Sequence, residues 1–287
     1  MDGLNQETLS GYLDRCRMPD GGYCYFHDPE NGGGFSSGAG FSNGADTAWA
    51  LSTYRWLKTD PPKLADTRAW LRVELDRNRI TQFSPYLFWF LRGLLLAGGS
   101  LSAEDHRHLI RETQRLLDDW ATPSDIPPLL EDLVEALSLR REASLSLSEK
   151  ENQRLADLLE QDPVPSDRPP LPELYTRLFL MKMSGRFSRT AIASAHGLER
   201  DYRHPSFGYV LVPGTSRSDL FILRSGLLMR SDPLPPPEAQ NLMNLVHACQ
   251  SREGGCGPIG GAVPTLEATC AALEVSWLLS TLTLERK

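Results

Sequence analysis

The order of apolar and polar positions divides the chain into two alternating kinds of helical segment. Segments of the first kind have one apolar stripe and one charged face, as in "SAEDHRHLIRETQRLLDDW" and "LSEKENQRLADLLEQ". Segments of the second kind are apolar almost all round, as in "FWFLRGLLL", "FILRSGLLM" and "PTLEATCAALEVSWLL". A helix with a single apolar stripe packs inward on one side, whereas a helix that is apolar all round is buried. The pattern therefore predicts outer helices that alternate with inner, buried ones.

The apolar segments recur at a nearly constant interval. Two of them share the motif Thr-x-x-Ala-Leu, at Thr47 and Thr269. Looser versions of the same frame are anchored at Phe90, Leu133, Thr176 and Leu223. Successive anchors are 43 to 47 residues apart, and a period of this size is typical of repeats built from helical hairpins. We expect one all-α domain over residues 1–287, an α/α toroid in which six outer–inner helical hairpins form two concentric rings.

Composition and charge narrow the classes of function. The chain carries 30 basic and 37 acidic residues, a net charge of −7, so it lacks the basic surface that nucleic acid requires. Its start, "MDGLNQETLSGYL", has no basic segment followed by an apolar one, and no apolar run reaches the roughly 18 residues of a membrane helix. Five cysteines without a Cys-x-x-Cys pair suit a reducing compartment. We expect a cytoplasmic protein without a nucleic-acid partner; peripheral membrane contact and the oligomeric state stay open.

One short motif is written twice, as "CRMPDGG" from Cys16 and as "CQSREGG" from Cys249. Both copies lead through a loop into an inner segment, "ADTAWAL" or "LEATCAAL". This pattern resembles the repeat of the terpenoid cyclase and protein prenyltransferase superfamily, which includes squalene–hopene cyclases, class II diterpene cyclases and the catalytic subunits of protein farnesyl- and geranylgeranyltransferases. The resemblance is clearest in the first and last units, and it implies an α/α toroid over nearly the whole chain.

A ring of six inner helices leaves a central cavity, lined by the first turns of these helices and by the loops before them. We expect apolar, aromatic walls, because aromatic ring faces stabilise a passing carbocation without supplying a nucleophile. The candidate substrate-binding residues are Trp49, Tyr86, Trp89, Tyr175, Phe207 and Tyr209, with His27 from the Gly-rich segment "GGYCYFHDPENGGGFSSGAGF". The alternative is that these aromatics belong to the core and that the Gly-rich segment is a surface loop.

The resemblance also implies where a catalytic acid would lie. Class II cyclases carry Asp-x-Asp-Asp-Thr-Ala at the start of an inner helix, and the middle acid protonates an alkene or epoxide. In this sequence Asn43, Ala45 and Asp46 stand in place of the three acids. The acids that occupy this frame, here or in later repeats, are Asp46, Glu131, Asp132, Asp219 and Glu267. For each of them the alternative is a first-turn acid that caps a helix or interacts with its dipole.

The zinc site that the resemblance would imply for a prenyltransferase cannot be matched. Ala268 stands where those enzymes have the zinc-binding histidine. Cys249, Cys256 and Cys270 have no nearby histidine except His247, on an outer segment, so we interpret them as buried apolar cysteines. We expect neither a metal nor a cofactor.

Two classes of function follow. The first is a terpene cyclase-like enzyme that acts on an isoprenoid or another apolar small molecule, by acid-initiated carbocation cyclisation. The second is a non-canonical enzyme, or a toroid that binds a ligand or partner in a biosynthetic pathway after losing the family's catalytic acid and zinc site. The full set of six repeats favours the first, and the missing middle acid favours the second.

Overall fold

The structure is a computed structural model, and it describes residues 4–24, 42–78, 84–121, 130–161 and 168–284. Within these ranges six outer helices alternate with six inner ones. The outer helices are α1 (Gln6–Cys16), α3 (Leu64–Asn78), α5 (Ala103–Ala121), α7 (Glu149–Gln161), α9 (Arg189–Leu198) and α11 (Pro236–Cys249). The inner helices are α2 (Gly44–Leu57), α4 (Ser84–Leu96), α6 (Leu130–Glu142), α8 (Leu171–Ser184), α10 (Leu220–Met229) and α12 (Leu266–Leu284).

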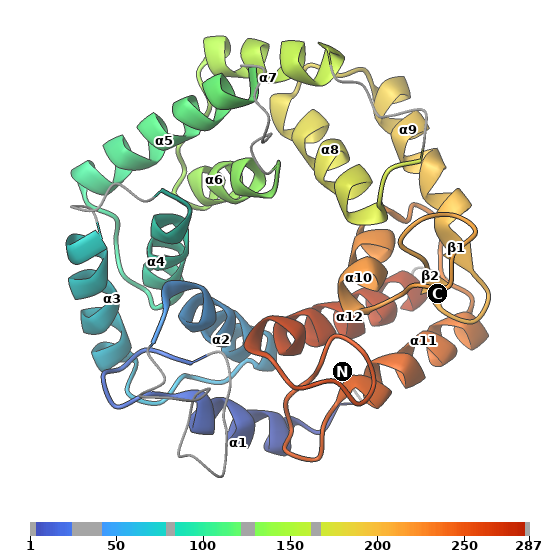
Figure 1. Cartoon of the computed structure of the whole chain (residues 1–287), viewed down its shortest axis with the longest axis horizontal. Helices are drawn as coiled ribbons and strands as arrows, with labels where there is room; N and C mark the ends of the chain where they lie inside the picture. The colour runs from blue at the N-terminus through green and yellow to red at the C-terminus, as the bar shows by residue number, and fades with distance from the viewer. Residues whose placement is uncertain (1–3, 25–41, 79–83, 122–129, 162–167, 285–287) are drawn as a thin grey trace.

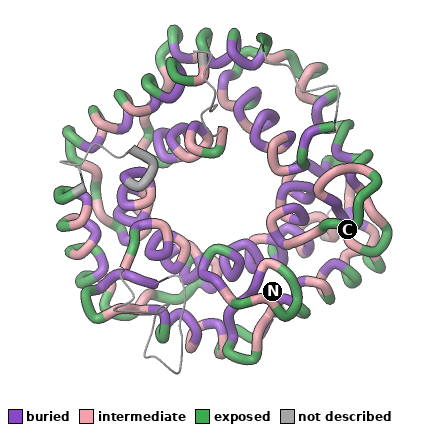
Figure 2. The backbone as a smooth tube through the Cα atoms, viewed as in Figure 1, coloured by how far each residue is buried: buried purple, intermediate pink, exposed green. Residues whose placement is uncertain are grey.

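The twelve helices form two concentric rings (Figure 1). Each inner helix contacts the next, from α2 through to α12, and α12 packs against α2, which closes the inner ring. The α/α toroid predicted from the repeat is therefore confirmed. Buried residues lie mainly between the two rings, and exposed residues cover the outer surface (Figure 2). No helix in the described ranges combines the length and the apolar character needed to span a bilayer.

The motif that is written twice forms the same hairpin in the first and last repeats. In the first, the backbone N–H of Tyr23 donates to the hydroxyl of Thr47 at 3.0 Å, and in the last, the N–H of Cys256 donates to Thr269 at 2.9 Å. These bonds attach each hairpin to the first turn of the following inner helix. Gly21 and Gly254 both adopt φ = 104°, a conformation that glycine adopts without the steric cost of a Cβ. The repeated sequence motif thus forms the same local structure in both repeats.

The fifth repeat carries a related hairpin that the sequence pattern did not predict. After a short 3-10 turn, Glu199–Tyr202, the strands β1 (Arg203–His204) and β2 (Gly208–Tyr209) pair antiparallel. Gly208, with φ = 73°, approaches α11 so closely that a Cβ would lie 2.4 Å from Leu242. Each strand has only two residues, too few for an alternating pattern to be recognised in the sequence.

Candidate functional site

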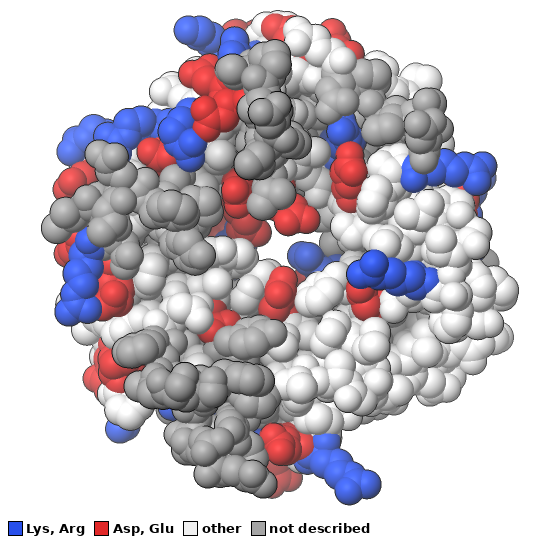
Figure 3. Space-filling view, viewed as in Figure 1, with Lys and Arg blue, Asp and Glu red and all other residues white. Residues whose placement is uncertain are grey.

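The inner ring surrounds a central hollow. The space-filling view shows this hollow with acidic and basic side chains beside it (Figure 3). On the inner helices, partly exposed side chains recur on one face: along α6 this face carries Glu131, Glu135, Ser138 and Glu142. Because the opposite face of each helix packs against the outer ring, the partly exposed face is the one that lines the hollow.

Two tryptophans form an aromatic part of the wall. Trp49 from α2 and Trp89 from α4 are both partly exposed, and their ring centroids are 5.0 Å apart at an interplanar angle of 47°. The guanidinium carbon of Arg92 lies 5.7 Å from the centroid of the Trp89 ring. On α8, Tyr175 packs against Phe179 with 6.5 Å between ring centroids. The sequence analysis predicted Trp49, Trp89 and Tyr175 as lining residues, and all three lie on inner helices with part of the side chain exposed.

Charged side chains accompany these aromatics at the same level of the ring. Nη1 of Arg92 on α4 is 2.5 Å from Oε2 of Glu135 on α6. Nε of Arg224 on α10 donates to Oε2 of Glu274 on α12 at 2.5 Å. Burial raises the pKa of Glu135, and Arg92 and Arg224 counteract part of this shift. Since α10 and α6 are separated in the ring by α8, an interaction between Arg224 and Glu135 means that both side chains point into the hollow.

Glu267 and Glu131 lie in the first turns of α12 and α6, which are opposite each other in the ring. Burial raises the pKa of Glu267, Arg224 counteracts part of the shift, and the like charge of Glu131 adds to it. The side chain of Glu267 is exposed to solvent, yet protein atoms around the hollow partly desolvate its carboxyl group. In the part of the chain that the structure describes, no basic side chain lies within ion-pair distance of Glu267. Its environment therefore favours the protonated acid.

Among known proteins, no family model and no curated protein matches the chain. A likeness appears among solved structures, to a variant of the type II terpene cyclase MstE from Scytonema in complex with its product, merosterolic acid A. The two chains share 12% identity with a TM-score of 0.60, and the match covers 96% of each chain. The chain has a terpene cyclase-like fold. At this level of identity the likeness concerns the fold alone, so the chemistry depends on the residues of the hollow.

Two other predicted acids of this cyclase-like fold take part in hydrogen bonds at helix N-termini. Oδ1 of Asn43, the N-cap of α2, accepts from the N–H of Asp46 at 2.8 Å, and the amide of Asn43 donates back to Oδ2 of Asp46. Asp219 is the N-cap of α10, and its Oδ1 accepts from the N–H groups of Phe221 and Ile222, both at 2.9 Å. The capping alternative thus describes the carboxyl group of Asp219, whereas the carboxyl group of Asp46 accepts a hydrogen bond from the side chain of the cap residue Asn43.

The carboxyl groups of Asp132 and Glu131 have different charged neighbours. Burial raises the pKa of Asp132, and Arg115 on the outer helix α5 counteracts this shift. Since Arg115 belongs to the outer ring, the carboxyl group of Asp132 lies on the α5 side of α6. The charge of Glu131, and not that of Asp132, contributes to the raised pKa of Glu267.

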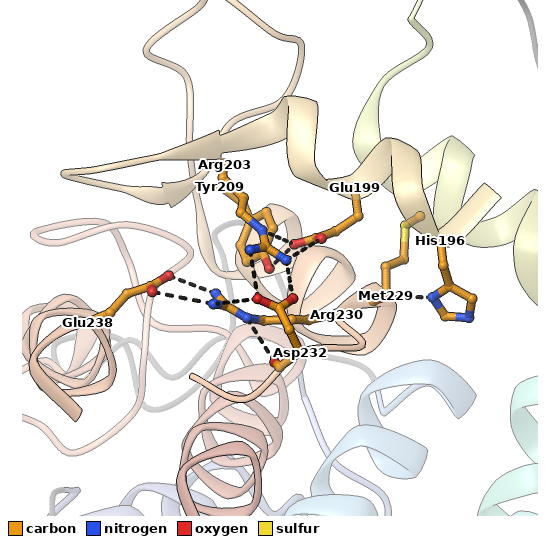
Figure 4. A network of polar contacts seen from close by, with 8 residues as sticks. All are labelled: His196, Glu199, Arg203, Tyr209, Met229, Arg230, Asp232 and Glu238. Carbon is orange, nitrogen blue, oxygen red and sulfur yellow. Dashed lines mark hydrogen bonds and ion pairs between the residues drawn. The ribbon is translucent and has the colours of Figure 1, made fainter. Parts of the chain in front are cut away.

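The remaining predicted residues lie elsewhere. Tyr209 is fully buried in β2, and its hydroxyl donates to Glu199, so the prediction that Tyr209 lines the cavity is not supported. Figure 4 shows Tyr209 in a polar network that joins the hairpin to the segment after α10. Phe207, between the two strands, stacks on His204 with 4.7 Å between ring centroids. His27 lies outside the described residues, and so does the side chain of Tyr86, whose backbone belongs to α4.

Sequence reasoning missed Arg92, Glu135, Arg224 and Glu274, which form ion pairs between neighbouring inner helices. A signal for them was present, because each is a charged residue within an inner helix that should be buried. A charge in such a helix needs a partner or access to water. The ring provides both, since the partner comes from the next inner helix and water from the hollow.

The cysteines do not form a metal site. Among the described residues, no three His, Cys, Asp or Glu side chains gather into a group that could hold a metal ion. Burial raises the pKa of Cys249 to about 11 and those of Cys256 and Cys270 to about 12. The raised pKa values keep these thiols protonated near neutral pH.

Proposed function

We propose that the chain is a terpene cyclase-like enzyme that folds an isoprenoid within the central hollow and starts its cyclisation with a proton from Glu267. The observation that carries the proposal is the environment of Glu267: the first turn of an inner helix, a desolvated carboxyl group, a neighbouring like charge and no ion-pair partner among the described residues. By contrast, the carboxyl group of Asp219 caps α10, and that of Asp46 accepts a hydrogen bond from Asn43.

In the proposed reaction the O–H of Glu267 breaks and its proton bonds to an alkene carbon or an epoxide oxygen of the substrate. The substrate becomes a carbocation, and Glu267 becomes a carboxylate. Further alkenes of the chain attack the cation in turn and close rings, and loss of a proton from carbon ends the sequence. The product is an isomer of the substrate, and Glu267 recovers its proton from solvent. The faces of Trp49 and Trp89, 5.0 Å apart, would stabilise the cation as it passes.

A second candidate is a toroid that binds a polar ligand or carries out other chemistry. The two ion pairs, Arg92–Glu135 and Arg224–Glu274, favour it. Charged groups are stabilised by water, and a wholly apolar ligand that displaced this water would leave them poorly solvated. The family's zinc ligands and middle acid are also absent from their usual positions.

Product analysis of purified protein separates the two candidates. The protein is incubated with geranylgeranyl diphosphate, squalene or squalene monoepoxide, and extracts are examined by gas chromatography and mass spectrometry. Glu267→Gln keeps the shape but cannot donate a carboxylic proton, so turnover should fall by about 100-fold or more. The matched control is Glu7→Gln, in the exposed first turn of the outer helix α1, and it should retain activity.

Turnover that survives in Glu267→Gln would exclude Glu267 as the proton donor. Absence of product from wild type, together with absence of bound isoprenoid in native mass spectrometry, would contradict the cyclase proposal. In that case the second candidate, a toroid that binds a polar ligand or carries out other chemistry, would describe the hollow.

A further inference from the structure

Arg224 presents unused hydrogen-bond donors to the hollow. Its Nε donates to Glu274 at 2.5 Å, and this bond holds the guanidinium group against α12. In the described ranges the two terminal nitrogens of Arg224 make no hydrogen bond. The side chain is 32% exposed. Four N–H donors on these nitrogens are therefore available to a ligand, on a planar group whose orientation Glu274 already sets.

Tyr175 supplies a second donor next to this guanidinium. Burial raises the pKa of Tyr175, and Arg224 is the charge that acts on it most strongly, in the opposite direction. The phenol thus stays protonated at neutral pH and keeps an O–H to donate. No partner of this hydroxyl occurs among the described residues. Arg224 and Tyr175 come from adjacent inner helices, α10 and α8, and both side chains are partly exposed.

The charges around these donors decide which acceptor fits. Four carboxyl groups, those of Glu135, Glu142, Glu267 and Glu274, lie near two guanidinium groups, those of Arg92 and Arg224. A carboxylate or diphosphate bound at Arg224 would add a negative charge beside Glu274 and close to Glu267. A neutral oxygen acceptor, such as an epoxide or carbonyl oxygen, accepts the same hydrogen bonds without this repulsion.

We infer that Arg224 and Tyr175 form a subsite for a neutral oxygen atom of the ligand, so that the substrate is an isoprenoid epoxide or carbonyl compound and not a plain hydrocarbon. The inference rests on the proposed function, because it takes the hollow as the substrate site. It adds that the oxygen lies on the same side of α12 as Glu267, because Glu267 precedes Glu274 by about two helical turns and Glu274 bonds to Arg224.

The test is a binding measurement with three probes that share a fifteen-carbon skeleton: farnesene, its terminal epoxide and farnesoic acid. Labelled probes are presented in the same detergent to Glu267→Gln protein, so that the proposed reaction does not consume them. The epoxide should bind about 10- to 100-fold more tightly than farnesene, as expected for hydrogen bonds to a charged donor. Farnesoic acid should bind more weakly than the epoxide.

Further variants, made in the Glu267→Gln protein, test the two donors without leaving a charge unpaired. Arg224→Met alone would leave Glu274 unpaired, so Arg224→Met is combined with Glu274→Met, which removes both charges together. The preference for the epoxide should then fall to within about 3-fold, and Tyr175→Phe should reduce it in part. Arg154→Met, on the outer helix α7 where Arg154 is 44% exposed, is the matched control and should keep the full preference.

Each outcome of the binding measurement supports or overturns the proposed subsite. Equal affinity for farnesene and its epoxide, or a preference that persists in the double variant, would overturn the subsite. Tightest binding of farnesoic acid would overturn its neutral character. Wild-type turnover of squalene monoepoxide, squalene or geranylgeranyl diphosphate, measured separately, reports on the proposed function. A cyclase that binds farnesene as tightly as the epoxide would therefore keep the function and lose only this inference.

Discussion

Gly254, in the last repeat, packs against Thr8 in the first helix so closely that a Cβ on the glycine would lie 1.9 Å from the Thr8 carbonyl oxygen. This contact joins the two ends of the ring. Beside it, the side-chain amide of Gln250 donates to the carbonyl oxygens of Asn5 and Gly254. The hairpin of the last repeat thus closes the toroid against α1.

We predict that Gly254→Ala destabilises the fold severely. The methyl group would clash with backbone at a position with φ = 104°, and the free energy of unfolding should fall by about 3 kcal/mol or more. Gly185→Ala is the matched control, because Gly185 also has a positive φ but nothing within 4 Å of its Cβ position. It should cost only about 1 kcal/mol. Urea denaturation compares the two, and equal losses would contradict close packing at Gly254.

The hydroxyls of Thr47 and Thr269 should contribute equally to stability. Thr269→Val removes the acceptor of the Cys256 N–H and leaves a buried donor unsatisfied, so unfolding should become easier by about 1–3 kcal/mol. Thr47→Val should do the same through Tyr23. Thr113→Val is the control, because the buried Thr113 hydroxyl only donates to a carbonyl of its own helix. If Thr113→Val lowered the free energy of unfolding as much as Thr269→Val, the loss would come from burying valine and not from the missing hairpin bond.

Tyr209→Phe should affect stability and not binding. The variant removes the hydrogen bond from the Tyr209 hydroxyl to Glu199, which should lower the free energy of unfolding by about 1–3 kcal/mol because the acceptor is a carboxylate. Because Tyr209 is fully buried, ligand affinity for the hollow should stay the same. Thermal unfolding and probe binding measure the two effects, and a large fall in affinity with unchanged stability would return Tyr209 to the binding site.

Glu267→Gln should make the fold more stable at neutral pH. The pKa of Glu267 is raised in the folded protein, so the folded state binds more protons than the unfolded state, and stability falls as pH rises from the unfolded value of about 4.3 through the folded one. Glutamine removes this loss. The two proteins should therefore be equally stable near pH 4 and diverge in favour of Glu267→Gln toward pH 7. Urea denaturation over this range gives the difference, and the opposite sign would mean that Glu267 is paired in the fold.

The candidate site could be predicted only in part. The frame of the repeat located Glu267, Trp49 and Trp89 on inner helices, because register along a helix follows from sequence. It did not separate Glu131 from Asp132, because neighbouring residues of a helix point about 100° apart, and the outer helix that receives Asp132 is known only from packing. The burial of Tyr209 could not be predicted either, because its two-residue strand forms only against the rest of the hairpin.

The sequence by itself determined the alternation of six outer and six inner helices, because amphipathic period and turn residues are local properties of the chain. It also determined the two matching hairpins, whose bonds to Thr47 and Thr269 lie within a single repeat. Tertiary structure alone decided which inner-helix charges meet: Arg92 with Glu135, Arg224 with Glu274, and Glu131 with Glu267. These groups are 43 to 136 residues apart in sequence, and closure of the ring brings them to one hollow, where burial and neighbouring charge set the chemistry of each carboxyl group.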